Sequence, residues 1–242
     1  MLPRSSATLA AFLYLILVSC GESQKKGPDK VGKKIIARDT LPPSVEGDSF
    51  PEEIEVEEEP FVLTEENAID FFFRYAKELK GNRVRVNTSM GSFTLRLYDN
   101  VPYHKANFIY LAEKNYFDST QFHRVVKDFI IQGGSTDNPK VMKKRRAIGR
   151  YLLPPDTRKG HSHHRGTISM PSSERDNPHK LASPYEFFIV VTSPGSYHLD
   201  GSYTPFGRVV EGMEVVDAIN SVPVGDGDWP WKSVYILNVE LL

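Results

Sequence analysis

The stretch QFHRVVKDFIIQGG, residues 121–134, places an arginine inside a largely apolar pattern. Arg124 has apolar residues on both sides, and Gln132 follows near the end of the stretch. A guanidinium keeps its proton inside a protein, so burying it without a partner is costly. We therefore expect Arg124 at the rim of a sheet instead of in the core. There it can act only as a cationic hydrogen-bond donor.

Short strand patterns dominate the body of the chain and must position this arginine. Apolar and polar residues alternate through 83–99, with a turn at 89–92, which predicts a hairpin. A helix is expected at 102–117, with Pro102 at its start. Another is expected at 211–222, where apolar residues recur at helical spacing. Besides the two strands in 121–134, the other strand patterns are residues 166–170, 185–192, 205–210 and 233–242. Many short strands with two internal helices favour a mainly β, closed antiparallel sheet.

The N-terminus has the features of an export signal. Leu9 to Val18 form an apolar core after Arg4, too short for the roughly 20 residues that span a bilayer. The core ends in Leu17-Val18-Ser19-Cys20, which resembles a bacterial lipobox, and Cys20 is the only cysteine of the chain. We expect residues 1–19 to be a lipoprotein signal peptide and Cys20 the lipidated first residue. An ordinary cleaved signal with an incidental cysteine is the alternative.

Charge is distributed unevenly along the rest of the chain. Residues 21–60 hold 6 basic and 11 acidic residues, so we expect an acidic, flexible linker over 20–60. The remainder, 61–242, holds 23 basic and 20 acidic residues, which gives no case for nucleic-acid binding. Helical spacing over 64–81 predicts that residues 61–82 add an N-terminal helix to a domain at 83–242.

Several motifs occur in order along the chain, the first of which contains Arg124. They are FHRVV (122–126), FIIQGG (129–134), GTISM (166–170), YEFFI (185–189) and HLDGSYTPFGRVVEGMEVVDAI (198–219). Together they resemble the cyclophilin family of peptidyl-prolyl cis-trans isomerases over 83–242. The resemblance implies a closed, eight-stranded antiparallel cyclophilin-like barrel with two capping helices. It also implies an enzyme that rotates X–Pro peptide bonds without a cofactor or a metal.

That reaction suits a fixed cationic donor. Resonance in the peptide bond imposes a barrier of about 18–20 kcal/mol, and a catalyst must bind the twisted amide better than either planar form. The proline nitrogen gains a usable lone pair as the bond twists, and by resemblance Arg124 donates to it. A hydrogen bond from a charged group is worth about 1.5–3 kcal/mol, or about ten- to 150-fold in rate. Apolar surroundings, which favour the less dipolar twisted amide, would supply the rest.

The resemblance also assigns a binding surface around Arg124. The positions that match the family's proline pocket are Phe129, Ile130, Phe188 and Leu199. The positions that match its polar rim are His123, Gln132 and Ser172. Tyr203 aligns with the family's pocket histidine and keeps an aromatic wall. From composition alone, the apolar members of this set would be interpreted as core.

Two residues depart from the family pattern. His198 stands where many members have tryptophan, which implies weak cyclosporin binding with isomerase activity retained. Glu186 stands where the family has glutamine. A carboxylate there would either orient Arg124 or bind it as an ion pair and slow catalysis.

Three other features have no counterpart in the resemblance. The run His161-Ser162-His163-His164 is expected in an exposed loop, because its spacing is not that of a closed zinc site. Weak metal binding there is the alternative. The basic run 143–146 is expected to be a solvated loop. Trp229-Pro230-Trp231 is expected to pack against the barrel end.

These features together predict an exported isomerase that is lipid-anchored in the bacterial cell envelope, facing the periplasm or the cell surface. Its partners would be proline-containing polypeptides, namely envelope proteins that it helps to fold, and a membrane. A second hypothesis is a binding module or chaperone that holds proline-containing segments with little turnover, which Glu186 favours if it neutralises Arg124. A third is a lipoprotein that binds metal through His161, His163 and His164.

Overall fold

The computed structural model describes residues 61–172 and 177–242, which lie in a compact unit spanning Glu57–Leu242. The expected signal peptide (1–19), Cys20 and the linker (20–60) fall outside the described residues. None of the helices in the described ranges is long and apolar enough to cross a membrane.

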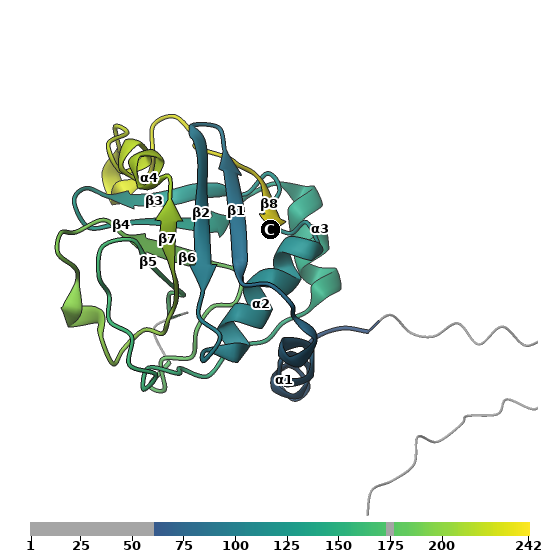
Figure 1. The fold of residues 1–242 in the computed structure, drawn as a ribbon. Coiled ribbons are helices and arrows are strands. Elements are labelled where there is room, and N and C mark those ends of the chain that lie inside the picture. Colours follow the sequence, from purple (N-terminus) through teal and green to yellow (C-terminus); the bar gives the residue numbers. More distant parts are fainter. Residues whose placement is uncertain (1–60, 173–176) are drawn as a thin grey trace, which may run out of the picture. The chain divides into compact units, whose positions relative to one another are not determined.

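Eight strands form one antiparallel sheet that curls into a barrel, as predicted (Figure 1). The strands are β1 (Arg83–Thr88), β2 (Gly91–Leu97), β3 (Gln121–Val126), β4 (Ile130–Ser135), β5 (Thr167–Ser169), β6 (Phe187–Val190), β7 (Pro205–Glu211) and β8 (Ile236–Leu241). Their order around the sheet is β3-β4-β6-β5-β7-β2-β1-β8. The predicted hairpin at 83–99 is therefore the β1–β2 pair.

Closure of the barrel is less complete than expected. The two end strands, β3 and β8, share no ladder. They are joined by an isolated bridge between Gln121 and Tyr235. Beside it, the Phe122 N–H donates to the Val234 carbonyl at 2.9 Å. The barrel is thus nearly closed, with a short seam next to the strand that carries Arg124.

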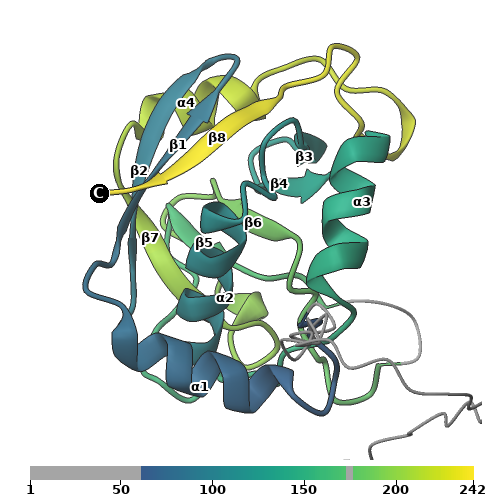
Figure 2. The ribbon, with the colours of Figure 1, turned by 90° about the vertical axis from the view of Figure 1, so that its right-hand side faces the viewer.

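Four helices surround the barrel: α1 (Ala68–Glu78), α2 (Pro102–Glu113), α3 (Pro139–Ile148) and α4 (Met213–Asn220). As predicted, α2 and α4 cover its two ends (Figures 1 and 2). The extra N-terminal helix is α1, which packs on α2 through aromatic contacts such as Phe72–Tyr110. It begins at Ala68 instead of at 64, because the Asn67 side chain accepts the Thr64 N–H at 2.8 Å before the first turn.

The helix α3 corrects the expectation that residues 143–146 form a loop. Its first turn is capped by Asn138, whose side chain accepts the Lys140 N–H at 3.0 Å, and Pro139 occupies the first helical position. Gly149 ends it with a φ of 133°. Asn-Pro at the start and glycine at the stop are recognised helix boundaries, so the signal was present in the sequence. Apolar periodicity did not indicate the helix, because it buries little apolar surface and its basic residues suggested a solvated loop.

The main core fills the barrel with aromatic side chains. Phe108 of α2 contacts Phe117, Phe187 and Phe206, with ring centroids 4.9, 5.6 and 5.7 Å away. Phe122 of β3 meets Phe187 edge to face. This packing fixes the inner face of β3 and β6, so the opposite face of the same strands is available for the site.

Candidate active site

A β-bulge at His123 determines which way Arg124 points. Phe122 lies opposite Gly133, whereas Arg124 lies opposite Gln132, so His123 is an extra residue on β3. Side chains alternate between the two faces of a strand, and a regular strand would put Phe122 and Arg124 on the same, inner face. The bulge shifts that phase. Phe122 is buried in the core while the Arg124 side chain keeps 41% of its surface exposed.

Arg124 begins a row of cross-strand neighbours on the outer face of the barrel. Gln132 of β4 lies opposite it, and Phe188 of β6 lies opposite Gln132. Ser169 of β5 lies opposite Phe188. Neighbouring strands are about 4.8 Å apart, so this row places a cation, an amide and an aromatic ring side by side.

An apolar cluster, separate from the main core, lies on the same face. We call it the outer cluster. Its members are Val126, Phe129, Ile130, Phe188, Val190, Leu199 and Tyr203. Tyr203 meets Phe188 edge to face, with ring centroids 5.6 Å apart, and His198 stacks on Phe129 at 5.5 Å. The apolar residues singled out from the sequence are therefore brought together, outside the core.

The turn that presents Phe129 is held by α4. The Asn220 side chain donates to the carbonyls of Val126 and Ile130 at 2.9 and 3.2 Å, and it accepts the Asp128 N–H at 2.9 Å. Asp128 has a φ of 57°. Sequence reasoning missed Asn220, because nothing in a helix pattern indicates that its last residue reaches across to another turn.

Glu186 does not pair with Arg124, contrary to both expectations for it. Its Oε2 accepts a hydrogen bond from Gln132 Nε2 at 2.9 Å and lies 3.6 Å from His123 Nε2. Burial raises the pKa of Glu186, but the contacts with His123 and Gln132 and the charge of Arg145 outweigh it, so the pKa lies below its ordinary value. The carboxylate is therefore ionised and is held by the polar rim.

The carboxylate beside Arg124 belongs instead to Asp228. Its Oδ2 lies 3.3 Å from Arg124 Nη2. Asp228 ends a short 3-10 turn, Asp226–Asp228, that lies beside β3.

The two tryptophans that follow this turn are largely exposed. The ring centroid of Trp229 lies 6.0 Å from that of His123, and Trp229 is 52% exposed, while Trp231 is 78% exposed. The expectation that these tryptophans pack the barrel end is therefore wrong.

A model of the family "cyclophilin type peptidyl-prolyl cis-trans isomerase/CLD" matches residues 83–241. The chain belongs to this family. This cyclophilin domain is 37% identical over 161 residues to peptidyl-prolyl cis-trans isomerase-like 1 from Neurospora crassa, covering 66% of this chain and 93% of the relative. It is 30% identical over 174 residues to a peptidyl-prolyl cis-trans isomerase from Acinetobacter baylyi, covering 69% and 88%. Of peptidyl-prolyl cis-trans isomerase-like 2 from Rhizopus delemar, 33% identical, the chain spans only 30%.

Solved structures agree with the cyclophilin fold. The crystal structure of a cyclophilin type peptidyl-prolyl cis-trans isomerase from Cryptosporidium parvum aligns with a TM-score of 0.56 and 25% identity, covering 67% of this chain and 98% of that one. A structure of the same protein in the presence of the dipeptide Ala-Pro aligns with a TM-score of 0.54 and 24% identity.

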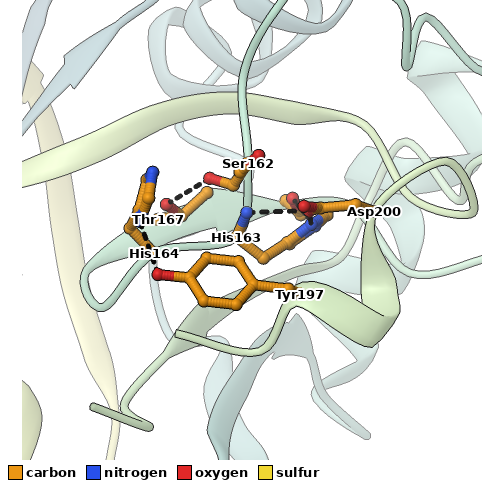
Figure 3. A network of polar contacts seen from close by, with 7 residues as sticks. Ser162, His163, His164, Thr167, Tyr197 and Asp200 are labelled. Carbon is orange, nitrogen blue, oxygen red and sulfur yellow. Dashed lines mark hydrogen bonds and ion pairs between the residues drawn. The ribbon is translucent and has the colours of Figure 1, made fainter. Parts of the chain in front are cut away.

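The histidine run of this cyclophilin domain is exposed only in part: His164 is exposed and His161 is half-buried, whereas His163 contacts Asp200 (Figure 3). His163 is fully buried: its Nδ1 lies 2.6 Å from an Asp200 carboxylate oxygen and its Nε2 lies 2.9 Å from the Ser169 hydroxyl. A carboxylate only accepts, so Nδ1 carries the proton and Nε2 accepts from Ser169. Burial lowers the pKa of His163, against the opposing effect of Asp200. The ring is a neutral support beneath Phe188, 6.0 Å away.

The other two histidines have separate partners. His161 stacks on Tyr98 at 3.8 Å and contacts Asn100, while His164 Nδ1 lies 3.0 Å from the Tyr197 hydroxyl. Within the described residues, no group of three or more His, Cys, Asp or Glu side chains converges on one point. The three histidines are thus separated, and the metal hypothesis has no support from their geometry.

Ser172 is tied to a loop instead of to the row. It bridges to Ala182, and its hydroxyl accepts a hydrogen bond from Asn177 at 3.1 Å. Among the hydrogen bonds of the described residues, none links Ser172 to His123 or Gln132. Its assignment to the polar rim stays a prediction that the geometry does not favour.

Proposed function

We propose that Arg124 is the donor of this cyclophilin domain and that the outer cluster receives the proline ring of the client. The observation that supports this is the row Arg124–Gln132–Phe188, which the bulge at His123 turns away from the core. A guanidinium has five N–H donors, and the pair with Asp228 joins it at Nη2. The other donors remain for a substrate.

The chemistry follows from these neighbours. Phe188 and Ile130 are buried at the base of the outer cluster, while Phe129, Leu199 and Tyr203 are partly exposed around them. A proline ring bound there loses water, and the twisted amide, being less dipolar, loses less solvation than the planar one. Arg124 then donates to the nitrogen lone pair that appears on twisting. Both effects stabilise the transition state more than the ground state. A crystal structure of the similar Cryptosporidium parvum protein was obtained in the presence of the dipeptide Ala-Pro, which carries such a proline ring.

A proline-binding module with little turnover is the second candidate, favoured by the ion pair between Arg124 and Asp228. Exchange NMR on a peptide with a single Ala-Pro bond separates the two. An isomerase raises the cis-trans exchange rate at catalytic concentration, and a binding module only shifts resonances in proportion to occupancy.

We propose further that the domain is tethered in the cell envelope by lipid on Cys20 and acts on envelope proteins. The apolar core ending in Leu17-Val18-Ser19-Cys20 and the single cysteine support this. Radiolabelled fatty acid should be incorporated into the wild-type chain and not into Cys20→Ser. Label that persists in Cys20→Ser would contradict the lipid anchor and leave the isomerase activity untouched.

Weak cyclosporin binding is part of the same proposal. His198 is exposed and stacks on Phe129, where it offers a smaller ring than the indole that many family members carry. Calorimetric titration of wild type and His198→Trp should show tighter cyclosporin binding by the variant. Equal affinities would contradict this role of His198.

A further inference from the structure

A cavity of about 630 Å³ lies beside α3, and it shares no lining residue with the outer cluster. Its walls come from residues 62–65, from α3 and the turn that follows it, and from residues 183–185. Residues 62–65 precede the family match at 83–241. The cavity is therefore built in part by an extension of this chain that the family domain does not include.

The extension is fixed in place by backbone hydrogen bonds. The Leu63 N–H donates to the Ile148 carbonyl at 2.8 Å, and the Leu63 carbonyl accepts the Arg150 N–H at 3.0 Å. A Cβ at Gly149 would lie 1.9 Å from the Leu63 carbonyl oxygen, so only glycine fits this contact. Leu63 itself is fully buried. The cavity is thus a built feature and not a gap between loosely packed segments.

The cavity wall is cationic. Its lining residues include three arginines, Arg145, Arg146 and Arg150, and a single acidic residue, Glu65. Arg145 lies over the Tyr185 ring, 4.6 Å from its centroid, which orients it. Arg146 and Arg150 are exposed, and neither forms an ion pair with the described side chains. Guanidinium groups of this kind bind carboxylates in forked geometry.

The cavity also lies close along the chain to the row Arg124–Gln132–Phe188. Its wall residue Tyr185 immediately precedes Glu186, and the influence of the Arg145 charge reaches that carboxylate. Phe188 lies three residues beyond Tyr185 along the chain, on β6, so the two Cα atoms are at most about 11 Å apart, the limit for an extended chain. An extended peptide spans that distance in about three residues.

We propose that this cavity binds an acidic side chain of the client, about three residues from the proline at the outer cluster. The domain then prefers proline segments that carry Asp or Glu at that spacing. This inference rests on the isomerase activity described above and names a substrate class for it.

Peptides with one Ala-Pro bond test the preference. One series carries Glu, Gln or Lys three residues before the proline, and a second series carries them three residues after it. Exchange NMR should show that wild type accelerates the Glu peptide about two- to fivefold more than the Gln peptide in one series, as expected for partly exposed ion pairs. The Lys peptide should be the slowest, and the ratio should fall toward one as salt shortens the screening length.

Matched variants assign the preference to the cavity. Arg146→Gln/Arg150→Gln should bring the Glu-to-Gln ratio close to one. Lys140→Gln/Lys143→Gln removes the same charge from α3 itself, at exposed positions outside the cavity wall, and should keep the wild-type ratio. Loss of the ratio in both double variants would show a diffuse field instead of a site, and would overturn the proposal.

Two other results would overturn it differently. A ratio of one in both series, with all peptides turned over, contradicts the acidic preference while the isomerase activity stands. No acceleration of any peptide contradicts the activity itself. A preference that emerges only when the six glutamates within 52–59 are replaced by glutamine would assign the cavity to the chain's own acidic segment instead of to a client.

Discussion

Asp228 Oδ2 lies 3.3 Å from Arg124 Nη2, so the carboxylate next to the proposed donor comes from the turn before β8 and not from Glu186. The two side chains keep 39% and 41% of their surface exposed, respectively. An ion pair that exposed is screened by water and worth about 0.2–1 kcal/mol. It is too weak to remove Arg124 from catalysis, and it restricts the rotamers of a long side chain. We infer that it orients the donor.

The substitution Asp228→Asn should therefore slow isomerisation modestly. The amide keeps a hydrogen-bond acceptor and loses the charge, and we expect a drop of about two- to fivefold in kcat/KM at low salt. Asp226→Asn, two residues earlier on the same turn, removes the same charge without touching the pair and is the control. A rate increase in Asp228→Asn would mean that the pair holds Arg124 back.

Glu186→Gln should leave kcat/KM within about twofold of wild type. Glu186 is bound by Gln132 and approached by His123, and a glutamine can still accept the hydrogen bond from Gln132. Glu214→Gln, on the exposed face of α4, controls for the change in net charge. A tenfold gain on replacing Glu186 alone would show that this carboxylate suppresses Arg124 and would favour the binding-module hypothesis.

Stability should fall with acid because of His104. Both its ring nitrogens are buried without a hydrogen-bond partner among the described residues, and burial lowers its pKa from 6.5 to about 3. Between these values the unfolded chain binds a proton that the native state does not. The contribution to the free energy of unfolding is therefore complete above pH 6.5 and is lost as the pH falls toward 3.

Urea unfolding measures this loss. The slope from one such group approaches 1.4 kcal/mol per pH unit, so wild type should lose about 2 kcal/mol between pH 6.5 and 5 from His104 alone. His104→Leu places an apolar side chain at this buried position of α2, and the dependence of stability on pH should become flatter. A residual slope of the same sign is expected from His163, whose pKa burial also lowers. An unchanged profile in His104→Leu would contradict the assignment to His104.

Much of the fold could be predicted because local patterns and packing agree. The alternation in β1 and β2 and the helical spacing in α4 correspond to faces that are buried in the structure, whereas α2 is buried on nearly all sides. The helix α3 could not be inferred from periodicity, since only Val141 and Ile148 are buried on it. Its stability comes from its caps and from contacts such as Arg145 on Tyr185, which are distant in sequence.

Only those residues of the site that lie within the matched motifs could be predicted from the sequence. Five residues of the outer cluster could be identified from the motifs, and the structure brings them together with Val126 and Val190. The partners of Arg124 and His163 were not, because Asp228 and Asp200 come from loops whose position depends on the closed barrel. The bulge at His123 could not be predicted either, because it is defined by the register between β3 and β4.

The exchange rate of a single Ala-Pro bond with Arg124→Gln is the most direct test of the account. We predict a fall in kcat/KM of about ten- to 150-fold, the worth of one charged hydrogen bond in the transition state. Arg85→Gln, which removes an exposed strand arginine on β1, should match wild type. If folded Arg124→Gln exchanges the peptide as fast as wild type, Arg124 is not the donor and the account is wrong.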